Sequence, residues 1–364
     1  MRLRLVSAAR TIDVEGDRIV PDRNPPDLVL DLGEAEIRPG LVNAHDHLHR
    51  NHLPRLGAPP YANVYDWGED LHARFAPELE GRHAIRRDKA LLFGALKNLL
   101  GGATTAVHHD PWEDVFERGF PIHVPRLASV HTLGLDRASM APAAADQAEP
   151  LALHLAEGTD VRAAEEVRTA DRLGLLNPSF LAVHAVGADD DGILRLSRSK
   201  AAVVWCPTSN VFLYGRTAPA SLLAGVDVLL GTDALVSGDG TLLDELRAAR
   251  ALGFLSDTRL EAAVTDVATR RLGLPSPSLE PGVSADLVVL RRPLLSARPS
   301  DVALVLVAGR PVLADETFRG LFAACTVAAE PLAVGGIPKL VASPLATVAR
   351  EVFDRAPACA RIIR

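Results

Sequence analysis

The sequence predicts an α/β fold in which strands and helices alternate along the chain, as they do in a parallel sheet or a closed barrel. The first observation behind this prediction is a series of short apolar runs, most of which end in a polar or ionisable residue. The second is that segments with helical periodicity separate these runs. The third is size, because 364 residues with 48% hydrophobic content can bury the core of one barrel-sized domain or of a barrel with a small satellite.

The apolar runs have the length and composition of strands, and they are residues 38–45, 104–110, 125–131, 151–157, 180–186, 201–207 and 226–233. Between them, residues 83–102 place leucines on one helical stripe and stop at Gly101 and Gly102, which predict a C-cap. A helix is also predicted over residues 258–273, where Thr258 and Glu261 have capping-box spacing. Residues 161–174 and 241–253 are predicted helices on the same grounds.

The two ends of the chain differ from its middle. Residues 1–36 and 279–330 lack long helical patterns and consist of short β-rich pieces with Gly and Pro turns. We expect them to pair into a small β-sandwich domain beside the barrel, which takes residues 37–278. Residues 331–364 are expected to form a C-terminal extension with one amphipathic helix.

Charge and cysteine content exclude several classes of protein. The net charge of −7 is spread along the chain with no block of Lys and Arg that could follow a phosphate backbone, so we expect no nucleic-acid partner. The sequence contains no recognisable signal peptide or membrane span. Its three cysteines are far apart, which fits a reducing compartment. We therefore expect a cytoplasmic protein with no membrane partner.

Residues 41–57 concentrate histidines at the end of the first predicted barrel strand. Because side chains alternate along a strand, His45 and His47 point to the same face, which at the C-terminal end of a barrel strand is the interior mouth. Two imidazoles there can share one zinc ion, but a catalytic zinc site needs further ligands. His49 and His52 lie beyond the strand end, where alternation no longer fixes their direction.

Other predicted strands supply candidates for those further ligands. His154, His184 and Asp233 each lie at the tip of an apolar run. Glu157 can turn toward the mouth if its strand ends near residues 155–156, and Gly158 favours such a turn. Each residue alone has a structural alternative, as a hydrogen-bonded core histidine or a turn-forming aspartate. Together, at the ends of several strands of one barrel, they favour a functional site.

These motifs resemble those of the amidohydrolase superfamily, in particular its mononuclear branch with cytosine, guanine and adenosylhomocysteine deaminases and triazine hydrolases. PGLVNAHDH resembles the first-strand HxH signature, HLAEG the fifth-strand His with the catalytic Glu, and VHAVG the sixth-strand His. CPTSN and GVDVLLGTD are similar to the seventh and eighth strands, and EPGVSADLVVL is similar to the flanking sheet. The resemblance spans nearly the whole chain and implies a (β/α)8 TIM-like barrel.

The resemblance also implies roles for individual residues. His45, His47, His154 and Asp233 would hold one divalent ion, with zinc favoured over iron and manganese. A cyclic amidine or aminated nitrogen heterocycle would then be deaminated by attack of a metal-activated hydroxide. Asp233 and His184 would serve that attack, and Glu157 would pass a proton to the ring nitrogen and toward the leaving group.

The number of metal ions follows from the lysines. Binuclear relatives bridge two metals with a carboxylated lysine from the fourth strand, but no lysine lies between Lys97 and Lys200. One metal ion is therefore expected. Family resemblance also suggests a homo-oligomer, and the partner expected for the site is a small molecule.

The chain departs from the family pattern in two places. Only residues 111–150 separate the runs 104–110 and 151–157, which is short for two complete strand–helix units. The barrel is therefore expected to be abbreviated around strands 3–4, with a short third strand around 121–125. The sequence after Asp233 also differs from that of the deaminases, which leaves the substrate open. Substrate contacts are expected from His131, Trp67 and His109, although each has a packing role as an alternative.

Two alternatives to deamination stay open at this point. The same site can hydrolyse another C–N or C–Cl bond, in a lactam or in an N-alkyl or chlorinated heterocycle. The chain can also be a catalytically inactive homologue that binds a metal or ligand, although Glu157 and His184 would have no use in a pure binding site.

Overall fold

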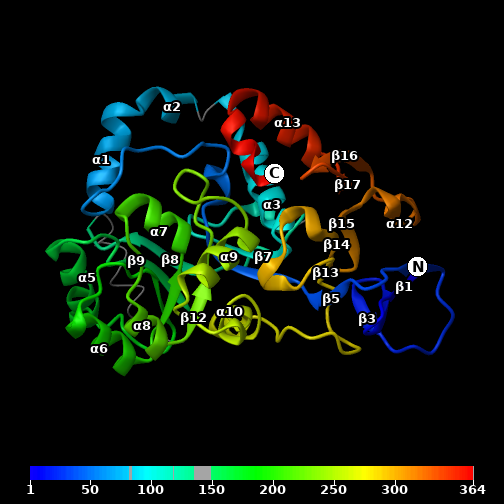
Figure 1. The fold of residues 1–364 in the computed structure, drawn as a ribbon, viewed down its shortest axis with the longest axis horizontal. Helices are drawn as coiled ribbons and strands as arrows, with labels where there is room; N and C mark the ends of the chain where they lie inside the picture. Colours follow the sequence, from blue (N-terminus) through cyan, green and yellow to red (C-terminus); the bar gives the residue numbers. More distant parts are fainter. Residues whose placement is uncertain (82–83, 118, 135–148, 364) are drawn as a thin grey trace.

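The computed structural model describes residues 1–81, 84–117, 119–134 and 149–363. Its central part is an α/β barrel of parallel strands with helices outside (Figure 1). The barrel strands are β6 (Leu41–Asp46), β7 (Ala103–His108), β8 (Ala128–Thr132), β9 (Leu151–Leu155), β10 (Phe180–His184), β11 (Ala202–Trp205) and β12 (Val228–Leu230). β8 to β12 form one sheet with neighbours in chain order, and β6 pairs with β7. The expected α/β barrel is therefore confirmed.

The third barrel strand is reduced to a single bridge. Thr105 of β7 pairs with His123 in parallel, and the backbone of His123 exchanges two hydrogen bonds with β7, at 2.8 and 3.0 Å. This bridge lies in the segment where the sequence analysis expected a shortened strand. Within residues 110–150, positions 118 and 135–148 lie outside the described residues, so the predicted connection there is described only in part.

The barrel closes where β12 meets β6. The amides of Thr232 and Asp233 donate to the carbonyl of His45 at 3.0 and 3.1 Å. Gly231 makes this approach possible, because a Cβ at that position would lie 2.6 Å from the Cβ of His45. The carbonyls of Ala263 and Val264 complete the seam by accepting the amides of Leu230 and Val42.

Outside the strands lie α3 (Arg87–Leu100), α5 (Val161–Arg172), α6 (Asp190–Ser199), α7 (Pro207–Tyr214), α8 (Ala220–Gly225), α9 (Leu242–Leu252), α10 (Asp257–Ala262) and α11 (Asp266–Arg271). The prediction of one helix over 258–273 is wrong, because the chain forms α10 and α11 there. The break at residues 263–265 frees the carbonyls that bond to β12 and β6. Ser256, rather than Thr258, caps α10.

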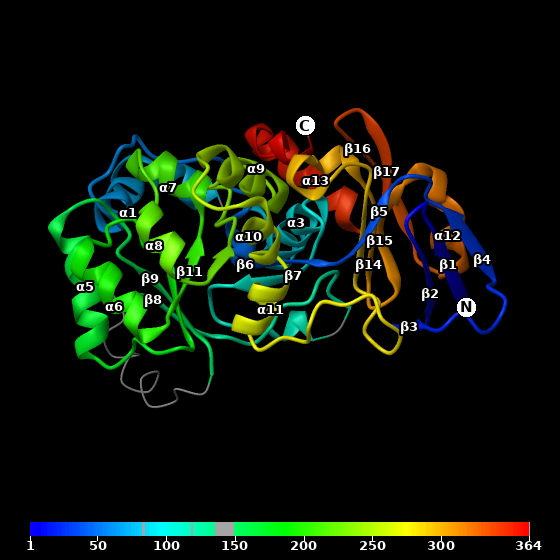
Figure 2. The same ribbon diagram turned by 60° about the horizontal axis from the view of Figure 1, so that its bottom comes forward.

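Two further sheets lie beside the barrel (Figure 2). The first comes from the N-terminal end of the chain alone, and the second combines one N-terminal strand with five C-terminal strands. The four-stranded sheet has the order β3-β2-β1-β4, with β1 (Arg2–Val6), β2 (Thr11–Glu15), β3 (Arg18–Val20) and β4 (Leu28–Asp31). The six-stranded sheet has the order β16-β17-β15-β14-β13-β5, with β5 (Glu36–Pro39), β13 (Leu287–Leu290), β14 (Val302–Val307), β15 (Arg310–Asp315), β16 (Ala329–Val334) and β17 (Ile337–Ala342). One apolar cluster joins them, with Leu3 and Leu5 from one sheet and Leu287 and Leu304 from the other.

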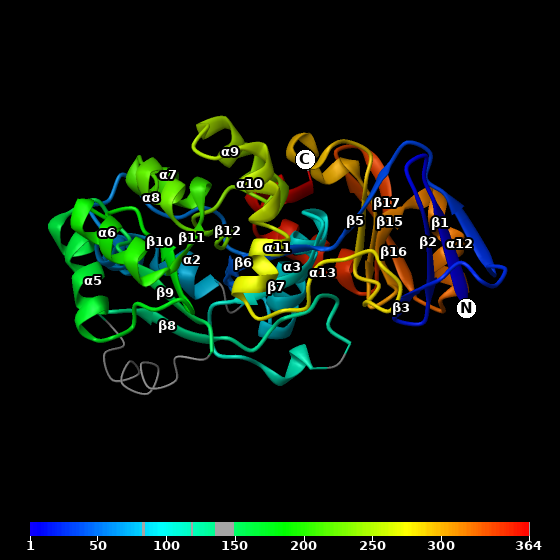
Figure 3. The same ribbon diagram turned by 90° about the horizontal axis from the view of Figure 1, so that it is seen from below.

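The last part of the chain returns to the barrel. β16 and β17 pair within the six-stranded sheet, so most of the segment from residue 331 to residue 342 is sheet rather than a separate extension. α13 (Leu345–Arg355) then packs on α3 (Figure 3). The rings of Phe353 and Phe93 lie 5.8 Å apart in this contact. α12 (Arg319–Ala324) packs against β15. Among the described residues, no helix is both long and apolar enough to cross a membrane.

α1 (Val64–Arg74) and α2 (Ala76–Gly81) follow the long segment after β6. Asn63 caps α1 by accepting the amides of Tyr65 and Asp66. The inner side of this helix pair packs against Val236 and its neighbours, which follow the end of β12. The two helices therefore lie on the side of the barrel where the strands end.

A buried ion pair fastens α3 to the barrel seam. The Nζ atom of Lys97 lies 3.0 Å from Oδ2 of Asp46 and donates to Oγ1 of Thr232 and to the carbonyl of Asp233, both at 2.8 Å. Lys97 and Asp46 are both 0% exposed. Because water cannot reach either charge, each depends on the other for compensation.

Replacing Lys97 by Met should therefore lower the free energy of unfolding by about 3–5 kcal/mol, because Asp46 is left buried without its counter-charge. Denaturant unfolding measures this loss. The matched control is Lys89→Met on the same helix, which breaks the half-exposed ion pair of Lys89 with Glu351 and should cost at most about 1 kcal/mol. Equal losses in the two variants would contradict the role of the buried pair.

Candidate functional site

The polar residues predicted at the strand ends come together at one place in the barrel. The Nε2 atoms of His45 and His154 lie 3.3 Å apart, and Oδ1 of Asp233 lies 3.7 Å from Nε2 of His45 and 3.8 Å from Nε2 of His47. His184 joins the same cluster, with a ligand atom within 4.8 Å of those of His45 and His154. All five side chains are buried.

The imidazoles of this cluster are oriented by acceptors behind them. The Nδ1 atom of His47 donates to Oδ2 of Asp110 at 2.6 Å, that of His154 to the carbonyl of His131 at 2.6 Å, and that of His184 to Oδ1 of Asn210 at 2.8 Å. A neutral imidazole that donates from Nδ1 presents a lone pair on Nε2. Each ring therefore presents a free lone pair to the centre of the cluster.

The charges of the cluster suit a cation. Burial lowers the pKa of His45, His47 and His154, so these rings are neutral at pH 7. Burial acts in the opposite sense on Asp233, but its contacts with the neighbouring imidazoles hold its pKa well below the ordinary value. The Asp233 carboxylate also accepts the hydroxyls of Ser209 and Ser237 at 2.8 and 2.7 Å.

The backbone at the cluster takes an uncommon conformation. His184 and Asp233 have φ angles of 71° and 53°, and Ala156 and Ala185 have 52° and 51°. Non-glycine residues rarely adopt such left-handed angles, and clusters of them are typical of functional sites. These residues turn the chain at or just after the ends of β9, β10 and β12, and the turns direct Glu157, His184 and Asp233 into the site.

Glu157 enters the site through one of these turns. β9 ends at Leu155, and the left-handed residue is Ala156 rather than Gly158, contrary to the expectation that the glycine makes the turn. Gly158 is required for another reason, because a Cβ there would lie 2.6 Å from the carbonyl oxygen of Ala62. The Glu157 carboxylate lies 3.7 Å from Nε2 of His184 and accepts the hydroxyl of Tyr214 at 2.8 Å. Burial raises its pKa.

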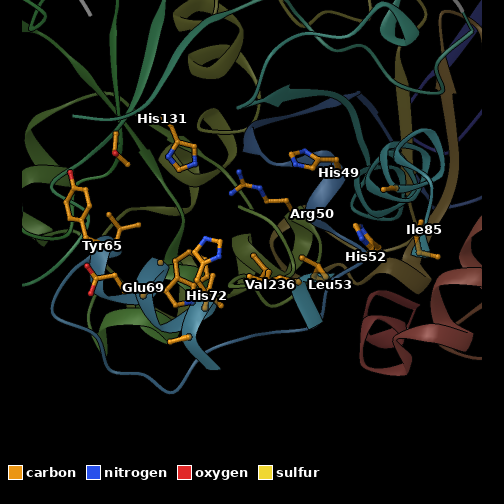
Figure 4. A pocket seen from close by; sticks show the side chains of 18 of the residues that line it. His49, Arg50, His52, Leu53, Tyr65, Glu69, His72, Ile85, His131 and Val236 are labelled. Atoms are coloured by element: carbon orange, nitrogen blue, oxygen red, sulfur yellow. The ribbon is translucent and has the colours of Figure 1, made fainter. Parts of the chain in front are cut away.

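A cavity of about 1120 Å³ lies beside this cluster, because the ring of His131 in its wall is 4.8 Å from the ring of His154. Figure 4 shows side chains that line the cavity. Its wall includes His131 and Thr132 at the end of β8, Val236 after β12, and Trp67 from α1. The indole of Trp67 donates to the carbonyl of Leu56 at 3.1 Å. α1 and α2 thus cover a space that opens next to the imidazole cluster.

The three residues predicted to contact substrate lie in different surroundings. His131 and Trp67 line the cavity. His109 is buried instead beside His154, with ring centroids 4.2 Å apart, and its Nε2 lies 3.1 Å from the carbonyl of Val130. His49 and His52, whose direction the sequence left open, also line the cavity.

Asp110 and Tyr214 are site residues that the sequence analysis missed. Asp110 follows the end of β7, so a carboxylate after a strand end was the available signal. Tyr214 lies on α7, more than 50 residues from Glu157 in the chain, and the sequence contains no signal for their contact. Asn210, the last residue of the CPTSN motif, orients His184.

A second group with metal-ligand composition consists of His49, His108 and Asp110. Its geometry disfavours a metal ion, because Nδ1 of His108 accepts the amide of Leu48 at 3.2 Å and Nε2 must then carry the proton. Asp110 is already engaged by His47. The first cluster is the better metal site.

That cluster passes a geometric test for zinc. Ligand atoms at about 2.0–2.1 Å from a tetrahedral zinc ion are separated by about 3.3 Å. The separations of 3.3, 3.7 and 3.8 Å around His45, His47, His154 and Asp233 are close to this value. Neutral imidazoles with one carboxylate are ordinary zinc ligands.

A parallel barrel with such a cluster at the carboxyl ends of its strands defines the class of metal-dependent barrel hydrolases. Comparisons with known proteins agree. The model of the amidohydrolase family matches residues 138–312. The 5-methylthioadenosine/S-adenosylhomocysteine deaminase of Moorella thermoacetica is 34% identical over 364 aligned positions, which cover 79% of this chain and 84% of the relative.

Solved structures of similar fold include an adenosine deaminase from Xanthomonas campestris with bound zinc, which has a TM-score of 0.64 and 21% sequence identity. The superposition covers 89% of this chain and 96% of the deaminase chain. Atrazine chlorohydrolase from Arthrobacter aurescens TC1 in complex with zinc has a TM-score of 0.65 and 20% identity, covering 89% and 99%. The chain belongs to the amidohydrolase family. This confirms the family expected from the sequence.

Glu166 supports the wall of the site from α5. Its carboxylate accepts the hydroxyl of Tyr65, a cavity residue, at 2.7 Å and the amide of Ala156 at 2.8 Å. Burial raises the pKa of Glu166 from 4.5 to about 7. The folded protein therefore holds a proton here that the unfolded chain releases between these two pH values.

Stability should fall by about 3 kcal/mol through this one group as pH rises from 4.5 to 7, because the folded state binds the proton more tightly over that range. Glu166→Gln removes the titration, so its unfolding free energy relative to the unmodified protein should rise with pH across this window. Urea unfolding at pH 5 and pH 7.5 measures the difference. Glu165→Gln, an exposed neighbour on α5, should show no such trend. A pH-independent difference for Glu166→Gln would count against the account.

Proposed function

We propose that this chain is a metal-dependent hydrolase that deaminates a cyclic amidine or an aminated nitrogen heterocycle. In this proposal His45, His47, His154 and Asp233 hold one divalent ion, with zinc favoured, and Glu157 and His184 serve the chemistry. The observation that carries this proposal is that these side chains meet at one place. Three pairs of nitrogen and oxygen atoms among the four proposed ligands lie 3.3–3.8 Å apart. The imidazoles of His47, His154 and His184 are each held by a hydrogen-bond acceptor behind the ring.

The relatives support this activity. The Moorella protein is named a 5-methylthioadenosine/S-adenosylhomocysteine deaminase, and the Xanthomonas structure is named an adenosine deaminase with bound zinc. Both names describe removal of an amino group from a heterocycle. The chlorohydrolase of the same fold supports the alternative, in which the site cleaves a C–Cl or a different C–N bond of a related ring.

A zinc ion at this site would supply a Lewis acid that makes hydroxide available near neutral pH. The chain's own residues would handle the protons. Asp233 is ionised and lies beside the ligand atoms of His45 and His47, so its carboxylate can accept a proton from the attacking water. His184 faces both the cluster and Glu157, so it can orient the nucleophile or polarise the ring carbon that carries the leaving group.

Glu157 is suited to proton transfer to the substrate. Burial favours the carboxylic acid form by raising its pKa, while the Tyr214 hydroxyl holds one oxygen in place at 2.8 Å. A protonated Glu157 can donate to a ring nitrogen, and the resulting carboxylate can take up and return a proton to the leaving amine. An inactive binding protein would have no use for such a buried acid.

Several features of the sequence analysis stay predictions. We take the two terminal sheets to form the small β-sandwich domain, with the barrel over residues 37–278. The site is assigned one metal ion, since no lysine lies between Lys97 and Lys200. We also expect a cytoplasmic location and a homo-oligomer.

Deamination is tested by measuring ammonia release with a coupled assay over a panel of aminated purines, pyrimidines and triazines, with chloride and amine release recorded in parallel. The proposal predicts ammonia from at least one ring. Release of chloride or alkylamine without ammonia would favour the alternative hydrolase, and metal-loaded protein inert on the whole panel would favour the inactive homologue.

Metal binding should depend on Asp110, because it fixes the ring of His47. Asp110→Asn is expected to weaken zinc affinity by about 10- to 100-fold, as loss of a carboxylate behind a ligating histidine generally does. Competition with a chromophoric chelator measures the affinity. His154→Ala should reduce the metal content well below one ion per chain, whereas Asp114→Asn, near the surface after β7, should leave it unchanged. Full zinc affinity in Asp110→Asn would contradict the assignment.

Replacing Glu157 by Gln should reduce kcat by about 10²- to 10⁴-fold, because the amide cannot donate and recover a proton as the carboxyl group does. The metal content should stay that of the unmodified protein, since Glu157 is not among the proposed ligands. Steady-state kinetics and elemental analysis together check this. Loss of the metal along with activity would instead place Glu157 among the groups that hold the ion.

A further inference from the structure

The cavity beside the cluster is unevenly charged. Three arginines, Arg50, Arg86 and Arg87, line it, and Glu69 is the one carboxylate among the described residues of its wall. Glu69 lies beside Tyr65 and His72, away from Arg50 and Ile85 (Figure 4). One end of the cavity is therefore cationic.

Of the three arginines in the cavity wall, Arg50 lies nearest in the chain to His47 of the cluster. It ends the short 3-10 helix η1 (Leu48–Arg50), which begins directly after His47. Its side chain extends into the cavity between His49 and His131 (Figure 4). Besides burial, the positive charge of Arg50 contributes to the low pKa of His47, as expected of a guanidinium close to that ring. Any group bound by Arg50 would lie next to the reacting ring of a substrate.

Most of the hydrogen-bonding capacity of Arg50 is not used within the described part of the protein. Its guanidinium makes one hydrogen bond there, a long one of 3.4 Å to Oδ1 of Asp110. The other oxygen of Asp110 is committed to His47 at 2.6 Å, so one carboxylate serves two partners. A guanidinium has five N–H donors in a planar fork that matches carboxylate and phosphate oxygens.

The two other arginines add positive potential at the same end. Arg86 and Arg87 stand at the start of α3, where the helix dipole is positive. Their partners are Asp88 and Glu113, in pairs at the protein surface. Burial is the main cause of the low pKa of His49, and the positive charge of Arg87 lowers that pKa further. The charge of Arg87 therefore acts on a residue of the cavity wall.

We propose that Arg50 binds an anionic substituent of the substrate, so that the heterocycle processed by this enzyme carries a carboxylate or a phosphate. This inference rests on the proposed function and narrows its substrate class. The ring would lie at the cluster near His131, and the anion would lie at Arg50, with Arg86 and Arg87 raising the local potential. The apolar remainder of the wall, including Trp67, Leu71 and Val236, fits the faces of a ring.

Matched pairs of compounds test this proposal: cytosine with cytosine-5-carboxylate, and adenosine with adenosine 5′-monophosphate. Binding to the zinc-loaded protein is measured by calorimetry, and turnover by ammonia release. The acidic member of at least one pair should bind about 10- to 100-fold more tightly than the neutral one, as expected for charge-assisted hydrogen bonds. The pair that shows the preference distinguishes a carboxylate from a phosphate.

Arg50→Met, compared at equal zinc content, should abolish this preference, because the KM of the acidic compound rises toward that of the neutral one. Arg50→Lys should restore part of it, because charge is kept without the planar fork. Arg74→Met, which removes an arginine outside the cavity wall, is the matched control. The proposal is overturned if no pair shows a preference or if Arg50→Met retains it. Deamination of neutral rings would then still stand, whereas absence of ammonia from every ring would reject the proposed function itself.

Discussion

The site depends on the closure of the barrel between β12 and β6. The carbonyl of His45 accepts the amides of Thr232 and Asp233, so residues nearly 190 positions apart in the chain lie side by side. Gly231 allows the approach, and the interrupted helix pair α10 and α11 supplies the carbonyls that complete the seam. Without this closure Asp233 could not reach the imidazoles of His45 and His47, and the cluster would lack its carboxylate.

Burying so many polar groups at one place has a cost that the surrounding acceptors offset. A buried imidazole without a partner is unfavourable, and a buried carboxylate more so. Asp110, Asn210 and the carbonyl of His131 each accept a hydrogen bond from one imidazole nitrogen. Two serine hydroxyls donate hydrogen bonds to Asp233. Nδ1 of His45 is buried and has no hydrogen-bond partner among the described residues, so this compensation is incomplete. A cation at the centre would add the attraction that the protein groups alone do not supply.

The barrel and the meeting of these side chains could be predicted because both depend on local patterns. Alternation along one strand brings His45 and His47 to one face, and parallel strands deliver His154, His184 and Asp233 to the same end. Contacts made across the fold could not be predicted in this way. Tyr214 reaches Glu157 from a neighbouring helix, and the break at residues 263–265 depends on hydrogen bonds to two distant strands. The turn at Ala156 also escaped prediction, since propensity favours glycine at a left-handed position.

The cavity connects this chemistry to selectivity. Most of its wall comes from η1, α1, α2, α3 and the segment after β12, with His131 and Thr132 at the end of β8, and none of the five clustered side chains is among its described lining residues. Substrate preference can therefore change while the cluster stays intact. We propose that His45, His47, His154 and Asp233 share one ion, and anomalous X-ray diffraction at the zinc edge from crystals of the zinc-loaded protein tests this most directly. We expect one strong peak about 2.0–2.2 Å from these four side chains; a peak bound elsewhere, or by His49, His108 and Asp110, would contradict the account.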